Sequence, residues 1–247
     1  IMTSSLRAVL ITDELEAGGT QRQILLLAEK LPLLGVHPTV IFFRNTSFLR
    51  ERIERTGAKV LQVERSSRFD LTFPFRLARV IRSLAPNVVH SFSFSGEFWG
   101  MIAHAISGTK APYLTSIRGK YEWYSILQWR IKAVVSKYSA RVVSNSLEGL
   151  AYAISRRGVQ EANAVVIHNG IDLKAFDAAA NRGWPIELQS IPATRRIVFV
   201  GRLVDHKNVP CLLRALAAVR ARGLMFHAVF VGDGPQRDAL VQQCAEL

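Results

Sequence analysis

Two cations, Arg202 and Lys207, lie between a segment at residues 196–200 that is continuously apolar after its first residue and a segment at 209–219 whose apolar residues recur at helical spacing. The first segment is typical of a strand buried in a parallel sheet, and the second is typical of an amphipathic helix. The N-terminus of that helix would offer unpaired backbone N–H groups, to which Arg202 adds a planar guanidinium and Lys207 a mobile charge. The pair therefore suits a diphosphate. The alternative is that both side chains are solvated surface cations.

Small residues follow several predicted strands, at the places where an open α/β sheet meets its ligands. A glycine has no Cβ and so lets the backbone approach a ligand closely, although a simple turn is an alternative explanation. The candidate residues are Gly18 and Gly19 after the first strand, Asn169 and Gly170 after the last strand of the first domain, and Gly232 and Gly234 after the last strand of the chain.

Short apolar segments alternate with segments of helical periodicity along the chain. The predicted strands are residues 7–13, 37–43, 58–63, 87–92, 113–117, 141–144, 164–168, 196–200 and 226–231. The predicted helices are residues 21–34, 47–56, 75–84, 96–106, 122–138, 147–155, 209–222 and a segment that begins at 235. This order predicts an α/β protein with parallel sheets.

An irregular stretch at 177–196, which contains two prolines, indicates a connection between domains. We expect a Rossmann-like domain at residues 1–180, a linker at 181–194 and a second Rossmann-like domain at 195–247. Two strands and two helices cannot bury both faces of a sheet, so the second domain is expected to be incomplete in this chain.

The 247 residues carry a formal net charge of +13, which predicts anionic partners. Residues 1–194 contribute 24 − 15 = +9 and residues 195–247 contribute 8 − 4 = +4, so no single tail carries the charge. No apolar run reaches the roughly 20 residues of a membrane-spanning helix, and the first residues lack the pattern of a signal peptide. The sequence thus predicts a cytoplasmic protein. Cys211 and Cys244 lie on apolar helix patterns, so buried free thiols are expected.

Two other classes of protein fit the sequence poorly. A nucleic-acid-binding module is not expected, because the cations are scattered and the sequence has no helix-turn-helix, zinc-finger or aromatic RNA-binding signature. An NAD-dependent enzyme is also disfavoured, because Gly18 and Gly19 lack the G-x-G-x-x-G spacing and no acidic residue ends the second strand.

Five segments together resemble the retaining glycosyltransferases of glycosyltransferase family 4, whose GT-B arrangement has two Rossmann-like domains. The segments are GGTQRQILLLAEKL (18–31), ARVVSNSLEGL (140–150), VVIHNGID (165–172), FVGRLVDHKN (199–208) and VFVGDGP (229–235). The resemblance implies that a hexosyl group moves, with retained anomeric configuration, from a nucleotide diphosphate sugar to a glycan, lipid-linked or small-molecule acceptor in polysaccharide or glycolipid synthesis. It also implies that no metal and no other cofactor is bound.

The resemblance assigns roles to several of the candidate residues. Arg202 and Lys207 match the family's GRLxxxK motif and would hold the donor diphosphate, where two fixed cations do the work of a divalent ion. Gly18 and Gly19 would approach the transferred sugar from the other domain when the cleft closes. The remaining donor-side candidates are Asn169, Gly170, Gly232 and Gly234.

The sequence departs from the family pattern at Arg118. Many members have a histidine near the donor sugar, and in TSIRGK the matching position is Arg118, which can bind an anion but cannot act as a base near pH 7. His90 and Glu97, in the segment HSFSFSGE, are expected on the acceptor side, although a core or turn histidine is the simpler interpretation of His90.

A second departure concerns the paired glutamates that grip the donor in the family, which belong downstream of Leu247. We therefore expect that the sequence is an N-terminal part of a longer enzyme and that these residues alone are poorly active. The alternatives are a GT-B-fold sugar epimerase or hydrolase, and a non-catalytic fragment.

The predicted helix at 122–138 mixes aromatic and basic residues, which favours an anionic membrane surface. Its exposed cations would include Lys132 and Lys137, and Trp123 or Trp129 would insert into the bilayer. The protein would then lie peripherally on the inner face of the cytoplasmic membrane. In the alternative interpretation the tryptophans pack on the sheet and the cations are solvated.

Overall fold

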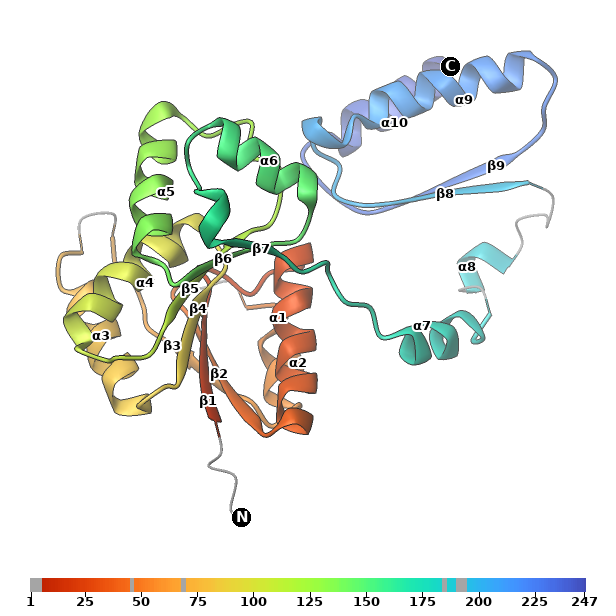
Figure 1. The fold of residues 1–247 in the computed structure, drawn as a ribbon. Coiled ribbons are helices and arrows are strands. Elements are labelled where there is room, and N and C mark those ends of the chain that lie inside the picture. Colours follow the sequence, from red (N-terminus) through yellow and green to blue (C-terminus); the bar gives the residue numbers. More distant parts are fainter. Residues whose placement is uncertain (1–5, 45–46, 68–69, 184–185, 190–194) are drawn as a thin grey trace. The chain divides into compact units, whose positions relative to one another are not determined.

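The computed structural model describes residues 6–44, 47–67, 70–183, 186–189 and 195–247, which form the units Ile1–Asp172 and Leu173–Leu247 (Figure 1). The division falls between Asp172 and Leu173, whereas the sequence predicted a first domain that extends to residue 180. Both units contain parallel strands joined by helices, which confirms the predicted α/β class.

A seven-stranded parallel sheet in the order β3-β2-β1-β4-β5-β6-β7 forms the centre of the first unit. The chain runs outward from β1 to one edge and then returns to build the other half from β4. The strands are β1 (Leu6–Ile11), β2 (Val36–Phe42), β3 (Lys59–Gln62), β4 (Val88–Ser91), β5 (Tyr113–Ile117), β6 (Arg141–Ser144) and β7 (Ala164–Val166).

Helices cover both faces of this sheet because successive strand residues point to opposite sides. Ala8 and Leu10 of β1 pack with α1 and α2, whereas Val9 and Ile11 pack with α3, α4 and α5. Figure 1 shows α1 and α2 on one side of the sheet and α3 and α4 on the other. The helices are α1 (Gly19–Lys30), η1 (Leu31–Leu34), α2 (Arg50–Glu54), α3 (Phe73–Leu84), α4 (Phe94–Ser107), α5 (Ile126–Tyr138), α6 (Leu147–Ser155) and η2 (Glu161–Asn163).

Serine residues fix the starts of the three helices that follow β4, β5 and β6. The hydroxyl of each serine accepts a hydrogen bond from a backbone N–H in the first turn of its helix: Ser93 from Gly96, Ser125 from Gln128 and Ser146 from Gly149. Such caps typically stabilise a helix by about 1 kcal/mol. The cap at Ser125 places the start of α5 at residue 126, after the predicted start at 122.

The second unit contains the two-stranded parallel sheet of β8 (Arg196–Val200) and β9 (His227–Val231). Phe199 and Phe230 pack against a small core on the side of α9 and α10. Val198 and Val200 remain exposed, in agreement with the prediction that two helices cannot cover both faces. The helices of the second unit are α7 (Leu173–Ala180), α8 (Ile186–Gln189), η3 (Asp205–Lys207), α9 (Val209–Ala221) and α10 (Arg237–Glu246).

The prediction of buried cysteines was wrong. Cys211 and Cys244 are both exposed, because α9 buries a narrow stripe that includes Leu213 and Leu216, and α10 buries Leu240. The irregular stretch at 177–196 is also more regular than its sequence indicates, since the end of α7 and all of α8 lie in it.

Candidate functional site

The strand order of the large sheet reverses between β1 and β4, and open α/β sheets bind ligands at the carboxyl edge of such a point. The loops that follow these two strands are joined there, because the backbone N–H of Asp13 donates to Oγ of Ser93 at 3.1 Å. A Cβ on Gly96 would collide with the same oxygen, so glycine allows α4 to begin close above β1.

The N-terminus of α1 faces open space. Gly18 is the N-cap residue, with extended backbone, and Gly19 is the first helical residue. Within the described residues no side chain caps this helix and no acidic residue lies in its first turn, so its terminal N–H groups keep their partial positive charge. A Cβ on Gly19 would meet no atom within 4 Å. This environment suits an anion or a sugar oxygen, and the binding of the donor by Gly18 and Gly19 stays a prediction.

Helix α1 also holds the segment that follows β7. The side-chain amide of Gln23 makes two hydrogen bonds with the backbone of Gly170, one to its carbonyl and one from its N–H, both at 3.0 Å. Further along the helix, Nζ of Lys30 lies 2.6 Å from a carboxylate oxygen of Asp172. The predicted residues Asn169 and Gly170 are therefore held against α1 by contacts that the sequence did not reveal.

Arg118 and Asn169, both predicted from the sequence, are in contact. Arg118 follows β5, and its Nη1 donates to Oδ1 of Asn169 at 3.2 Å. Its guanidinium carbon lies 4.9 Å from the ring centre of Phe92, which follows β4. Burial lowers the pKa of Arg118 from its usual value. The side chain is thus held between an aromatic face and an amide oxygen, at a fixed place on the edge of the sheet.

His90 lies next to this arginine, on β4. Its Nε2 is 2.8 Å from Oγ of Ser116, and its ring centre is 4.2 Å from that of Phe92. Burial, together with the nearby charges of Arg118 and Lys132, lowers the pKa of His90 to about 3. The imidazole is therefore neutral at neutral pH, and its hydrogen bond to Ser116 agrees with the simpler interpretation of a core histidine.

Glu97 lies in the protein core and not on the acceptor side where the sequence placed it. Its carboxylate is 2.5 Å from Nζ of Lys132, and it also accepts from the backbone N–H of Ser116. Lys132 donates in turn to the carbonyl of Ser116, and both charged side chains are at least 95% buried. Burial raises the pKa of Glu97 and lowers the pKa of Lys132. The pair fixes the end of β5, the strand that carries Arg118.

In the second unit, Arg202 and Lys207 are exposed on the loop between β8 and α9. The backbone of this loop is tied to the segment after β9. The N–H of Gly201 donates to the carbonyl of Val231 at 3.0 Å, and the N–H of Leu203 donates to that of Asp233 at 2.9 Å. The two cations thus extend from a fixed backbone, as the sequence predicted for a strand-to-helix loop.

Gly232 and Gly234 make this arrangement possible. A Cβ on Gly232 would collide with the carbonyl oxygen of Gly201, and one on Gly234 would collide with the backbone of Leu203. The N–H of Gly234 donates to the side chain of Asp233 at 2.8 Å. Both glycines therefore bring two loops together, which places Arg202, and a direct contact with the donor stays a prediction for both.

Several residues of the site were not predicted. Asn145, which follows β6, donates to the carbonyl of Arg118 at 3.5 Å, and the hydroxyl of Tyr121 accepts from the N–H of Arg118 at 2.8 Å. The position of Asn145 directly after an apolar strand is a signal that could have identified it. Lys132 carried a signal too, because it shares one face of α5 with the buried residues Trp129 and Val135.

The described residues contain no candidate metal cluster and no candidate membrane span. No cluster of three or more His, Cys, Asp and Glu side chains lies close enough together to hold a metal ion there. No helix in the same part of the chain combines the length and the apolar character that crossing a membrane requires. Independence from metal remains a prediction.

The chain matches two family models. Residues 17–175 match the model described as Glycosyltransferase Family 4, and residues 194–247 match the model described as Glycosyl transferases group 1. A similar protein of known annotation is the 2-deoxystreptamine N-acetyl-D-glucosaminyltransferase of Streptomyces fradiae, which is 28% identical over 257 residues and covers 90% of this chain. The chain spans 60% of that protein, and less than two thirds of the length of the curated relatives it matches first.

Solved structures show the same fold. The crystal structure of HepE from Anabaena, in complex with UDP and glucose, matches with a TM-score of 0.78 at 17% identity over 98% of this chain and 66% of that chain. A glycosyltransferase from Rickettsia africae matches with a TM-score of 0.77 at 20% identity over 99% of this chain and 65% of that one. The fold of the chain is the GT-B fold, which is built from Rossmann-like domains.

Proposed function

The chain belongs to glycosyltransferase family 4, and we propose that it transfers a sugar from a nucleotide diphosphate sugar to a hydroxyl group of an acceptor. The observation that carries the proposal is the loop after β8, which exposes Arg202 and Lys207 on a backbone tied to β9. Two cations at fixed positions suit a diphosphate, because its negative charge is spread over several oxygens that accept charge-assisted hydrogen bonds.

The donor that we propose is a hexose linked to a nucleoside diphosphate. The structures of HepE from Anabaena contain UDP and glucose, UDP alone, or UDP-glucose, and the fold of that protein is shared by this chain. This similarity supports a donor of the same chemical class. UDP-hexoses are therefore the first donors to test.

In the proposed reaction the bond between the anomeric carbon and the β-phosphate oxygen breaks, and the acceptor oxygen forms the new bond with retained configuration. The proton of the acceptor hydroxyl leaves with the diphosphate. Negative charge then grows on the departing diphosphate. Arg202 and Lys207 would stabilise that charge, as cations placed before the reaction do most effectively in a site that excludes water. We propose that these side chains take the place of a metal ion.

The transferred sugar of the donor and the acceptor are both proposed to lie at the carboxyl edge of the large sheet. There the uncapped N-terminus of α1 and the contact between Arg118 and Asn169 offer hydrogen-bond donors to a polar ligand. The acceptor class is a glycan, a lipid-linked sugar or a small molecule with a free hydroxyl, in polysaccharide or glycolipid synthesis.

We also propose that the first unit binds peripherally to an anionic membrane, through a different set of residues from the one that the sequence indicated. Lys132 is buried with Glu97, and Trp129 is 4% exposed, so neither can reach a lipid. Lys120 is paired with Glu122 at 3.1 Å. Lys132 and Trp129 are therefore not part of the proposed membrane contact.

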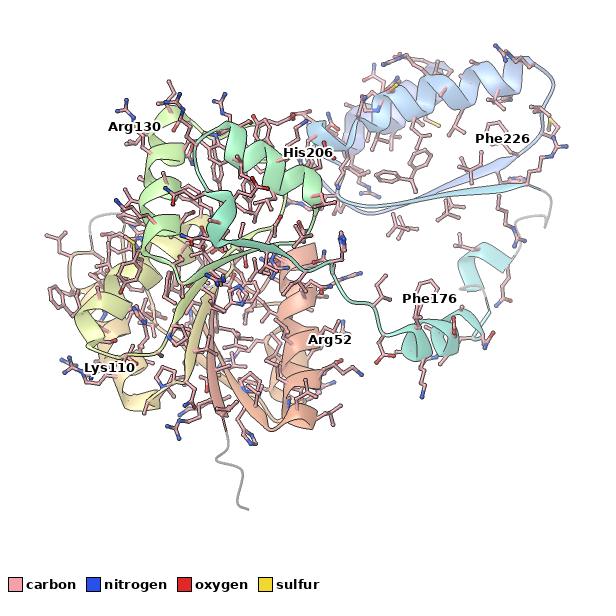
Figure 2. The ribbon with its side chains drawn as sticks, in the orientation of Figure 1. Arg52, Lys110, Arg130, Phe176, His206 and Phe226 are labelled. Carbon is pink, nitrogen blue, oxygen red and sulfur yellow. The ribbon has the colours of Figure 1, made fainter. Side chains whose placement is uncertain are left out.

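Exposed residues near the start of α5 form the surface that we propose binds the membrane. Ile126 and Leu127 are 70% and 66% exposed, and Trp123, three residues before Ile126, is 67% exposed. Arg130, which Figure 2 shows on the outer side of α5, lines the same hollow as Ile126 and Arg156. Apolar side chains beside arginines suit the interface of an anionic bilayer, where each cation contributes about 1 kcal/mol. We call Trp123, Ile126, Leu127, Arg130 and Arg156 the α5 surface.

Nucleotide binding tests the proposed function directly. Thermal unfolding of the 247-residue chain is measured with UDP, UDP-glucose, UDP-N-acetylglucosamine and GDP-mannose, with UMP as the control that lacks the β-phosphate. A ligand at 100 times its Kd stabilises the folded state by about 2.7 kcal/mol, so the Tm should rise with at least one diphosphate and less with UMP. Equal behaviour of UMP and all diphosphates would contradict the proposal.

Product analysis then separates the reaction types. Release of UDP that depends on an added hydroxyl acceptor supports transfer. Release that is independent of any acceptor would favour the hydrolase or epimerase alternative on the same fold.

A further inference from the structure

We propose that Arg118 forms an anion-binding subsite for a carboxylate or phosphate group carried by a substrate. This inference rests on the proposed function, because it specifies the chemistry of a molecule bound at the edge of the large sheet. The subsite is formed by Phe92 after β4, Arg118 after β5, Asn145 after β6 and Asn169 after β7, so four adjacent strands contribute to it.

The charge of Arg118 is the first reason. Among the described residues, no carboxylate lies within ion-pair distance of its guanidinium, although other arginines of the same unit, such as Arg50 and Arg76, have acidic partners at 2.9 and 2.7 Å. Glu97, the buried acid near β5, is already paired with Lys132. A partly buried cation without a counter-charge is unfavourable, so the structure has a place for an anion here.

The hydrogen-bonding capacity of the site is the second reason. A guanidinium has five N–H donors, and in the described part of the chain Asn169 is the one protein acceptor that contacts them. Nε of Arg118 is buried without a partner, and so is Oδ1 of Asn145. Buried polar atoms are nearly always satisfied in folded proteins, so the two atoms indicate a missing ligand or water.

The fixed position of the guanidinium is the third reason. Phe92 covers one side of it and Asn169 holds Nη1, so the side chain is oriented before any ligand arrives. A pre-oriented planar fork binds carboxylate and phosphate through two parallel hydrogen bonds, which a flexible lysine cannot do equally well.

These features select anions over neutral sugars. A hydroxyl group would be bound adequately by neutral amides, whereas a desolvated cation loses its hydration without compensation unless the ligand is charged. A uronic acid, a sugar phosphate or a lipid-linked phosphate carries the required group on the acceptor side, and a nucleotide sugar carries it on the donor side. The shared chemistry is an oxyanion with at least two accessible oxygens.

The test uses the 247-residue chain and two glycosides that differ in one group. Methyl β-D-glucuronide has a carboxylate where methyl β-D-glucoside has a hydroxymethyl group, and methyl phosphate and UDP are titrated separately. The readout is the ¹H–¹⁵N resonance of Nε of Arg118, identified by its absence in Arg118→Lys. A saturable shift with methyl glucuronide or methyl phosphate, and none with methyl glucoside, is expected.

Three variants complete the experiment. Arg118→Gln lacks the reporter resonance, so its binding is measured by calorimetric titration, where the anion should bind about tenfold more weakly or worse because a charge-assisted pair is removed. Arg79→Gln, at an exposed position of α3, is the matched control and should bind like the wild type. Asn169→Ala removes the holding contact but keeps the charge, so it should still bind the anion, and the Tm of each variant identifies a loss caused by misfolding.

The outcomes separate the two sources of the anion. A shift with methyl glucuronide or methyl phosphate but not with UDP assigns the subsite to the acceptor, and a shift with UDP assigns it to the donor. The proposal is overturned when no anion moves the resonance, or when both glycosides move it equally. In either case a rise of the Tm with UDP that depends on Arg202 and Lys207 would leave the proposed function intact.

Discussion

The ammonium group of Lys132 lies 2.5 Å from the carboxylate of Glu97, and both groups are buried beneath the carboxyl edge of the large sheet. The two residues come from neighbouring helices, α5 and α4, and both also bond to the backbone of Ser116 on β5. An ion pair at this place ties two helices to the strand that ends at Arg118. Mutations can separate the contribution of the whole pair to stability from the cost of leaving one of its charges buried alone.

Glu97→Ala should lower the free energy of unfolding by about 3–5 kcal/mol, because it leaves the ammonium of Lys132 buried without a partner. The double variant Glu97→Leu, Lys132→Met should recover most of that loss, since no charge remains in the core. Urea unfolding measures both. Glu51→Ala, which breaks an exposed pair with Arg55, is the control and should cost about 0.5 kcal/mol or less. Equal stability of Glu97→Ala and Glu51→Ala would show that the buried pair is not formed.

His90 should make the protein less stable in acid. Its pKa in the folded protein is about 3, below its usual value of 6.5, so the unfolded chain binds more protons between these values. The contribution of the neutral imidazole is fully present above pH 6.5 and is lost as the pH falls toward about 3. His90→Gln, which replaces the imidazole by an amide that does not titrate, should flatten this dependence. Unfolding curves at several pH values test it, and parallel curves for the two proteins would count against the buried neutral histidine.

Arg202→Ala and Lys207→Ala should each weaken binding of a nucleoside diphosphate by about 1.5–3 kcal/mol, the contribution of a hydrogen bond to a charged group. That loss corresponds to about a 10- to 150-fold higher Kd. Calorimetric titration with UDP measures it. Arg220→Ala, on the exposed side of α9, removes an equal charge from the same unit and should leave the Kd unchanged. A similar loss in all three variants would indicate a general charge effect and not a diphosphate site.

Gly232→Ala should displace the loop that carries Arg202. The added methyl group would collide with the carbonyl of Gly201, and such overpacking typically costs about 1–3 kcal/mol. Affinity for UDP should fall as well, because Arg202 moves with its backbone. Gly223→Ala is the matched control: it strains a glycine with φ of 81° but meets no atom within 4 Å, so it should cost stability without changing UDP affinity. Unchanged UDP binding in Gly232→Ala would argue that the loop adapts.

Ile126→Glu should reduce binding to vesicles that contain anionic lipid, because it places a charge in the middle of the α5 surface. Arg130→Glu should do the same and should also weaken the salt dependence of binding. Sedimentation with acidic and neutral vesicles provides the measurement. Leu33→Glu is the control, since Leu33 is 77% exposed on η1 and lies outside the α5 surface. Equal partition of the wild type onto neutral and acidic vesicles would remove the proposed membrane contact.

Much of the fold could be predicted from local patterns. Each strand of the large sheet has an apolar run of the predicted type, and the sequence placed the strands within a few residues of their observed bounds. Helix starts were less accurate because caps decide them. Ser125, the cap of α5, looks like any loop serine until its hydroxyl meets the N–H of Gln128.

The sequence predicted several individual residues of the site but not the contacts between them. Arg118 and Asn169 were both candidates, but their hydrogen bond joins the segments that follow two different strands, and no local spacing encodes it. Glu97 was misplaced for the same reason: an acid in the first turn of α4 is ordinarily exposed, and its burial depends on Lys132, which is distant in the sequence. Long-range pairs of this kind can be identified only in the three-dimensional structure.

The hydrogen bonds and the ion pair that join α1 to the segment after β7 have a consequence for synthesis on the ribosome. Gln23 and Gly170 are separated by 147 residues, and Lys30 and Asp172 by 142. The first helix leaves the exit tunnel long before its partners exist, so these contacts cannot form until the seventh strand has been translated. Contacts of such sequence separation slow folding. The side of α1 that carries Gln23 and Lys30 therefore stays uncovered during most of the translation of the first domain.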